Sequence, residues 1–233
     1  MSGRVAVVTG ASGAIGSAVA RRFATAGYDL ALFGRDRARL EATLARCSEA
    51  GIRAEALVCD VKDDSSVATA CAKVRQTYSA PDALVLCAGT GRYASFLETG
   101  IDDWRGMLEV NVLGVVRFIR EFLPQLIERR RGHVVVVGSR RGLEPSWESA
   151  AYSSSKAALH GMVKSLSQEA SRHGVHVCLL SPGGVKGNFR GVAAGEQTTW
   201  LEPENVAEAA AFIVANAGHS WVRQLDILPL GRG

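Results

Sequence analysis

An apolar run that leads directly into a glycine turn near the N-terminus constrains the fold of this chain more than any other feature. Residues 5–8 are Val-Ala-Val-Val, and three glycines, Gly10, Gly13 and Gly16, follow before a segment with helical spacing. Glycines at such positions let the backbone turn tightly, pack a helix closely on a strand and approach a pyrophosphate group. The N–H groups that open the helix favour the same phosphates. The sequence therefore predicts a strand, a turn and a helix that bind a dinucleotide; a turn needed only for packing is the alternative.

The rest of the chain alternates between strand-like and helix-like stretches. Strands are predicted over residues 4–9, 28–33, 52–59, 82–87, 133–138, 175–181 and 223–228. Helices are predicted over residues 14–26, 36–50, 64–79, 102–130, 150–173 and 203–217. Such alternation is typical of a parallel sheet with helices on both faces. We expect a single α/β domain over residues 1–233, a Rossmann-type doubly wound sheet of about seven strands, with its ligand site at the carboxyl ends of the strands.

A set of three residues that follow the fifth predicted strand, Ser139, Tyr152 and Lys156, suggests acid–base chemistry. Tyr152 and Lys156 are four residues apart in a predicted helix, so their side chains share one face. An ammonium group beside a phenol lowers the tyrosine pKa from about 10 toward neutrality, the range that suits a general acid. Ser139 would supply a hydroxyl for a substrate oxygen. A tyrosine and a lysine at this spacing also occur by chance on solvated helices, so the pair alone does not decide the function.

Taken together, these features resemble the short-chain dehydrogenase/reductase family over essentially the whole chain. The stretch Thr9 to Gly16 matches the family motif T-G-x-x-x-[AG]-x-G. The other matches follow in the family's order and are Asp60, Asn111, the triad Ser139, Tyr152 and Lys156 in the pattern S-x12-Y-x-x-x-K, and the segment Pro182-Gly183-Gly184-Val185. The resemblance implies the fold already expected from the alternation of strands and helices.

The resemblance also implies a nicotinamide dinucleotide as cofactor. The cofactor-binding residues expected on this basis are Gly10, Ser12, Gly13, Ile15, Gly16, Arg35, Asp60, Val61, Ala88, Gly89, Tyr152, Lys156, Pro182, Gly183 and Val185. At the end of the second predicted strand, Gly34 stands where NAD-preferring relatives commonly have an acidic residue. Arg35 can pair with a 2′-phosphate and Ser12 can add a hydroxyl, so we expect NADP(H) rather than NAD(H). The alternative is that Arg35 is a solvated residue at the start of the next helix.

The catalytic residues that the resemblance implies are Asn111, Ser139, Tyr152 and Lys156. Tyr152 would give a proton to a carbonyl oxygen as general acid, Ser139 would orient that oxygen, and Lys156 would lower the tyrosine pKa and hold the nicotinamide ribose. Asn111 would hold a water on the proton path. The expected function is NADP(H)-dependent reduction of a ketone or aldehyde to an alcohol. Oxidation of an alcohol with NAD(P)+ and a non-catalytic NADP(H)-binding interaction protein are the alternatives.

Two positions depart from the family's pattern. Leu86 and Cys87 stand where the family usually has two asparagines, whose side chains mostly brace the central sheet. Gly187 stands where a threonine hydroxyl commonly contacts the nicotinamide carboxamide, and Asn188 and Thr198 are candidate replacements.

An unusual pair of arginines follows Ser139, where relatives usually have small or apolar residues. A substrate that carries a carboxylate or phosphate is one hypothesis; arginines that lie in solvent or pair with nearby glutamates are the alternative. The residues expected to line the substrate half of the cleft are Arg92, Tyr93, Arg140 and Arg141. A short substrate lobe is expected near residues 184–203.

Composition and charge argue against several other classes of protein. The 233 residues are 47% hydrophobic and 21% charged, which is typical of a globular domain. No apolar segment approaches the roughly 20 residues of a membrane-spanning helix, and the chain enters its first strand too early for a signal peptide, so we expect a cytoplasmic protein. The net charge of +4 has its sharpest cluster at residues 129–131, where three arginines complement a helix C-terminus better than they suit nucleic acid.

The spacing of the cysteines and histidines gives no indication of a metal site or a disulfide framework. The five cysteines and five histidines have neither disulfide-framework nor metal-ligand spacing. We therefore expect no metal, a small-molecule carbonyl substrate, no nucleic-acid or membrane partner, and a homodimer or homotetramer.

Overall fold

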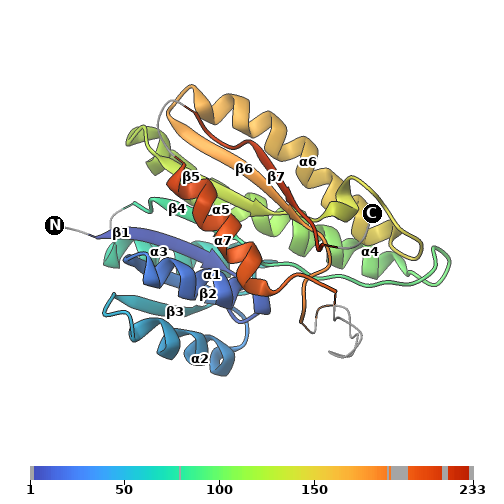
Figure 1. The fold of residues 1–233 in the computed structure, drawn as a ribbon, viewed down its shortest axis with the longest axis horizontal. Coiled ribbons are helices and arrows are strands. Elements are labelled where there is room, and N and C mark those ends of the chain that lie inside the picture. The colour runs from blue at the N-terminus through green and yellow to red at the C-terminus, as the bar shows by residue number, and fades with distance from the viewer. Residues whose placement is uncertain (1–2, 79, 188, 190–198, 217–219, 231–233) are drawn as a thin grey trace.

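The computed structural model describes residues 3–78, 80–187, 189, 199–216 and 220–230 (Figure 1). Within these residues seven strands form one parallel sheet in the order β3-β2-β1-β4-β5-β6-β7. The strands are β1 (Arg4–Thr9), β2 (Tyr28–Gly34), β3 (Ala54–Val58), β4 (Ala83–Leu86), β5 (Gly132–Val137), β6 (Val175–Pro182) and β7 (Gln224–Ile227). Figure 1 shows β3 and β7 at opposite edges of the sheet.

Helices cover both faces of the sheet, which confirms the predicted fold. They are α1 (Ala14–Thr25), α2 (Arg37–Ser48), α3 (Asp64–Thr77), α4 (Ile101–Leu108), α5 (Gly114–Glu128), α6 (Ala150–Ser171) and α7 (Pro203–Ala215), with a π-helical turn η1 (Glu109–Leu113) and a 3-10 turn η2 (Arg140–Gly142). One apolar core lies between the sheet and α3, α5 and α6, and a second lies between the sheet and α1, α2 and α7. No helix among the described residues is long and apolar enough to cross a membrane.

The central strands are buried on both faces, which explains why they are continuous apolar runs. The four residues from Val5 to Val8 in β1 are completely buried, and all residues of β2, β4 and β5 are buried as well. Parallel strands between two helix layers require this composition. The edge strand β7 instead alternates between exposed and half-buried residues.

The predicted helix over residues 102–130 is the main local difference from expectation. It consists of α4, the π-turn η1 and α5 in direct succession. A π-turn adds one residue to a helical turn and so changes the direction of the side chains after it, often at a functional site. Asn111 lies inside this turn.

The topology fixes where a ligand cleft forms. The chain runs from β1 through β2 to β3 toward one edge, and then returns to β4 on the other side of β1. The loops after β1 and β4 therefore separate at the carboxyl ends of these strands, which is where open α/β sheets bind ligands. Part of the expected substrate lobe, residues 188 and 190–198, lies outside the described residues, as do the candidate replacements Asn188 and Thr198.

Candidate active site

A cavity of about 690 Å³ opens at the carboxyl ends of the strands. All cofactor-binding residues expected from the sequence line it: Gly10, Ser12, Gly13, Ile15, Gly16, Arg35, Asp60, Val61, Ala88, Gly89, Tyr152, Lys156, Pro182, Gly183 and Val185. Ser139, Tyr93, Arg140 and Arg141 line it too. The cavity thus brings together seven segments of the described chain: the glycine turn with the start of α1, the loops that follow β2, β3, β4, β5 and β6, and helix α6.

The glycine turn after β1 is shaped by close backbone contacts. Gly10 has a φ of 66°, and a Cβ on Gly16 would lie 2.2 Å from the carbonyl oxygen of Gly10. The N–H of Gly13 donates to the same carbonyl at 2.9 Å. Side chains at Gly10 and Gly16 would collide with neighbouring backbone atoms, so this tight turn requires glycine at both positions.

The start of α1 suits a phosphate group. Gly13 is the N-cap residue and provides no side-chain cap, so the first N–H groups of α1 have no side-chain oxygen as partner there. No acidic residue occupies the first turn of this helix. The helix dipole and these N–H groups both favour an anion, so the residues present fit the pyrophosphate of a dinucleotide.

A hydrogen bond joins the loops on the two sides of the cleft. The Thr9 hydroxyl oxygen accepts from the N–H of Ala88 at 3.1 Å, and Thr9 itself is buried. A Cβ on Gly10 would lie 2.9 Å from Ala88 Cα. The neighbouring Cys87 also lines the cavity, and burial raises the pKa of its thiol to about 12, so this departure from the family's asparagine places a neutral group there.

Two arginines stand at the end of the cavity beyond β2. Arg35 follows this strand, and Arg39 lies four residues later in the first turn of α2; both are exposed and line the cavity. The Asp36 carboxylate accepts from the N–H of Arg39 at 3.0 Å and caps the helix. A Cβ on Gly34 would lie 2.8 Å from Ser12 Oγ, so the serine hydroxyl occupies the space beside this glycine. Sequence reasoning missed Arg39, although its spacing from Arg35 is a usable signal.

Ser139 and the helix α6 form the opposite end of the cavity. Ser139 follows β5, and its Oγ accepts from the N–H of Arg141 at 3.2 Å. Tyr152 and Lys156, one turn apart in α6, are both buried. Lys156 Nζ lies 5.9 Å from the centroid of the Tyr152 ring and donates to the carbonyl oxygen of Val137 at 3.1 Å. Burial lowers the pKa of Lys156 to about 8, because the charged ammonium is removed from water.

Asn111 lies behind this group rather than in the lining of the cavity. Its side chain is fully buried; Oδ1 accepts from the N–H of Thr90 at 2.8 Å, and Nδ2 donates to the carbonyl of Thr90 and to Ser155 Oγ, both at 2.9 Å. A Cβ on Gly89 would lie 3.4 Å from Asn111 Oδ1 and 3.6 Å from Lys156 Nζ. The asparagine thus fixes the loop after β4 against α6.

Aromatic rings surround Tyr152 on the substrate side of the cavity. Its ring centroid lies 5.4 Å from that of Tyr93 and 5.8 Å from that of Phe189. Trp200 lines the same side and packs closely over Gly184. Phe189 and Trp200 were not predicted, because they belong to a segment without a recognisable motif and reach the cavity only through the fold.

Gly187 has a backbone conformation that explains its departure from the family's threonine. Its φ is 147°, a region that β-branched residues avoid. A Cβ at this position would also lie 3.1 Å from Ala14 Cβ at the start of α1. The position therefore requires glycine in this chain. The adjacent Lys186 lines the cavity and forms an ion pair with Glu202.

The arginines expected to line the substrate half differ in their surroundings. Arg92 does not line the cavity, and the expectation for it is wrong, because its exposed guanidinium pairs with Asp103 near the start of α4 at 3.3 Å. Arg140 lines the cavity but pairs with Glu144 at 2.6 Å, as the alternative interpretation held. Arg141 lines the cavity, and its guanidinium donates to the backbone carbonyl of Glu144 at 3.3 Å.

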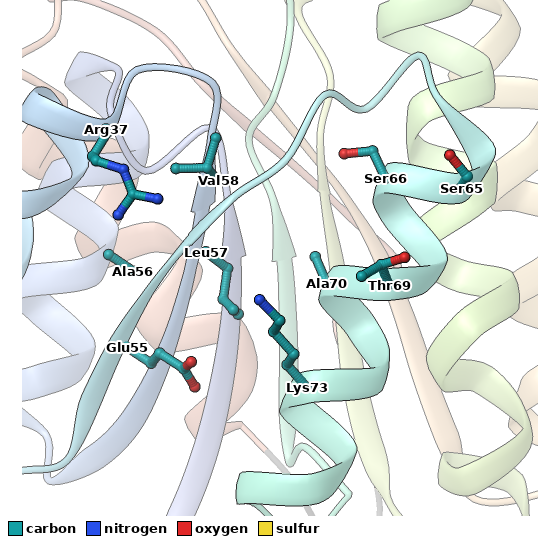
Figure 2. Close-up of a pocket in the computed structure, with 10 residues that line it drawn as sticks. All are labelled: Arg37, Glu55, Ala56, Leu57, Val58, Ser65, Ser66, Thr69, Ala70 and Lys73. Carbon is teal, nitrogen blue, oxygen red and sulfur yellow. The ribbon is translucent and has the colours of Figure 1, made fainter.

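A second, smaller cavity of about 400 Å³ lies at the β3 edge of the sheet, between α2 and α3. Figure 2 shows Lys73 and Ser66 pointing into it from α3, Glu55 from β3 and Arg37 from the start of α2. None of the motif residues lines this cavity, and its charges are of mixed sign. It is therefore separate from the site described above.

Comparison with known proteins gives consistent matches over the chain. A family model described as short chain dehydrogenase matches residues 4–197. An oxidoreductase of Staphylococcus saprophyticus is 31% identical over 228 residues, which cover 97% of each chain. An alcohol dehydrogenase from the archaeon Thermococcus sibiricus, solved with 5-hydroxy-NADP, superposes with a TM-score of 0.90 at 29% identity, covering 99% of this chain and 98% of that one. A metagenomic short-chain oxidoreductase solved with NADP gives a TM-score of 0.87 at 31% identity, covering 99% of both chains.

Proposed function

This chain belongs to the short-chain dehydrogenase family and is an oxidoreductase, and we propose that it reduces the carbonyl group of a ketone or aldehyde with NADPH. The observation that carries the proposal is the single cavity that joins the glycine turn of β1 to Ser139, Tyr152 and Lys156. A fold alone would not support a particular reaction, whereas a tyrosine and a neighbouring lysine beside a dinucleotide-binding turn do support this one.

NADPH, when bound, supplies the hydride that reaches the carbonyl carbon. Tyr152 donates the proton of its hydroxyl to the carbonyl oxygen. Ser139 orients that oxygen: its own Oγ already accepts from the N–H of Arg141, so its hydrogen is left to donate to the substrate. Lys156 is still largely protonated at pH 7 with a pKa of about 8, and its positive charge stabilises the phenolate that remains on Tyr152.

The buried amide of Asn111 has a positioning role in this scheme. It holds the loop at Thr90 and the helix at Ser155 in a fixed relation, and these two segments border Lys156 and Tyr152. Because Asn111 Oδ1 and Lys156 Nζ both approach Gly89, we propose that the proton returned to Tyr152 after the reaction passes along this side of the cavity.

The preference for NADPH is proposed from the charges beyond β2. Arg35 and Arg39 present two guanidinium groups, and Gly34 offers no carboxylate to a ribose hydroxyl. A 2′-phosphate suits paired guanidinium groups, and the Ser12 hydroxyl lies beside the same glycine. Two similar structures were solved with NADP or a derivative of it, which supports the same cofactor here.

Fluorescence titration with NADPH and NADH tests the cofactor proposal. We expect the wild-type protein to bind NADPH at least roughly 10-fold more tightly, because each charge-assisted hydrogen bond to the phosphate contributes on the order of 1.5–3 kcal/mol. Arg35→Gln combined with Arg39→Gln should remove this difference and leave the NADH affinity within about twofold. Arg37→Gln is the matched control, since Arg37 faces Glu41 and the smaller cavity. Equal affinity for both nucleotides in the wild type would contradict the proposal.

A further inference from the structure

We propose that the carbonyl substrate carries a carboxylate or phosphate and that Arg141 binds this anionic group. The inference rests on the proposed reductase function, because it concerns the substrate half of the same cavity. It names a class of substrate, an anionic ketone or aldehyde, and one residue that selects it.

Arg141 belongs to the short turn that positions Ser139. Its N–H donates to Ser139 Oγ, and both residues line the cavity with Tyr152. The next residue, Gly142, is so close to α6 that a Cβ there would lie 2.8 Å from the carbonyl oxygen of Lys156. The turn η2 is therefore packed directly against the catalytic helix, and the start of the Arg141 side chain has a fixed place relative to the reacting groups.

The charge of Arg141 is not neutralised by a carboxylate in the part of the chain that the structure describes. Glu144 is the nearest candidate, but its carboxylate is bound by Arg140 Nε at 2.9 Å and by a second nitrogen of the same guanidinium at 2.6 Å. The guanidinium of Arg141 donates to the backbone carbonyl of Glu144, a group that carries no net charge. The three residues together leave one positive charge beside Ser139.

The other groups on this side of the cavity do not compete for an anion. Lys186 is paired with Glu202, and the rest of the described lining near Tyr152 includes the aromatic side chains Tyr93, Phe189 and Trp200. These rings suit the carbon skeleton of a substrate, and the guanidinium of Arg141 suits its charge. A guanidinium binds a carboxylate or phosphate through two parallel hydrogen bonds, whereas a neutral carbonyl compound would leave it without such a partner.

Matched pairs of substrates test the inference. At saturating NADPH, kcat/KM is measured for keto acids and for the amides of the same acids, with aliphatic and aromatic side chains. A second set compares phosphorylated ketones with the corresponding free alcohols, which distinguishes a carboxylate from a phosphate. We expect the anionic member of at least one set to be preferred by roughly 10–100-fold, in line with a charge-assisted hydrogen bond.

Three variants show whether Arg141 causes this preference. Arg141→Gln keeps most of the length of the side chain and should abolish the preference by raising KM for the anion, with the kcat/KM of the neutral partner changed by less than about threefold. Arg141→Lys should restore part of it. Arg92→Gln is the control, because Arg92 is an exposed arginine outside the cavity and paired with Asp103. NADPH affinity, measured for each variant, shows that the cofactor half is intact.

The possible failures are distinguishable. Tyr152-dependent reduction of neutral and anionic partners at equal rates, or a preference unchanged by Arg141→Gln, would overturn the inference and leave the reductase proposal standing. No reduction of any compound in either set would count against the reductase proposal itself, and the inference would fall with it.

Discussion

Lys156 carries a positive charge at a buried position, and removing that charge from water has a cost in the free energy of folding. The pKa of this group falls from its ordinary value of 10.5 to about 8, which corresponds to about 3 kcal/mol against the charged form. The hydrogen bond to the carbonyl of Val137 offsets part of this cost. A charge in such a place is typical of a functional group rather than a structural one.

Replacement of this lysine should therefore stabilise the protein while it abolishes turnover. We expect Lys156→Met to raise the free energy of unfolding at pH 7 by on the order of 1–2 kcal/mol, the burial cost less the lost hydrogen bond. The folded-state pKa is below the unfolded one, so the wild type bears the full cost below pH 8 and loses it as the pH rises to 10.5. Urea unfolding at several pH values checks this. The difference in the free energy of unfolding between Lys156→Met and the wild type should shrink between pH 8 and 10.5, and a difference that grows there would contradict the prediction.

Loops and short turns, rather than the regular elements, give this site its shape. The glycine turn after β1 leads directly into α1, the π-turn η1 holds Asn111 between the loop after β4 and helix α6, and η2 joins Ser139 to the substrate side. The turn after β1 and η2 contain glycines, Gly10 and Gly142, at which a side chain would collide with nearby backbone. The segment at Gly187 shows this most clearly, because its φ of 147° and its contact with Ala14 leave no place for the threonine that relatives have.

Gly187→Thr consequently should not improve the site. We expect the variant to be destabilised by about 1–3 kcal/mol from backbone strain and to bind NADPH more weakly, because the new side chain pushes on the start of α1. Gly27→Thr is the comparison: it has a similarly unfavourable φ of 78° but open space around it and no place in the cavity lining. It should lose stability without losing NADPH affinity. Tighter NADPH binding by Gly187→Thr in thermal-shift and fluorescence measurements would show the geometric explanation to be wrong.

At the scale of the whole molecule, most of the architecture could be predicted because the strands are apolar on both faces and the turns contain glycine. The helix and strand boundaries agree with the prediction within two residues, apart from the interruption at η1. That π-turn leaves no signature in the hydrophobic spacing, so a continuous helix was predicted over residues 102–130. Local patterns predict local structure well, whereas the order of the strands in the sheet is seen only in the structure.

The residues that line the cavity were less predictable from the sequence than the position of the cavity. Residues in motifs line the cleft apart from Asn111, which lies behind it, whereas Arg39, Phe189 and Trp200 line it without belonging to any motif. Arg92 was predicted to line it but turns toward Asp103 on α4. Sequence neighbours of a motif share its loop, but the direction of each side chain depends on tertiary partners that the sequence does not reveal.

The central claim is that one cavity holds a reductant and a proton donor, and that Tyr152 is the donor. The most direct measurement is NADPH-dependent carbonyl reduction by the wild type and by Tyr152→Phe, which differ by a single hydroxyl oxygen at a buried site. We expect kcat to fall at least roughly 100-fold, the usual size of a lost general acid, with the NADPH dissociation constant changed by less than about threefold. Turnover by Tyr152→Phe at the wild-type rate would contradict the account.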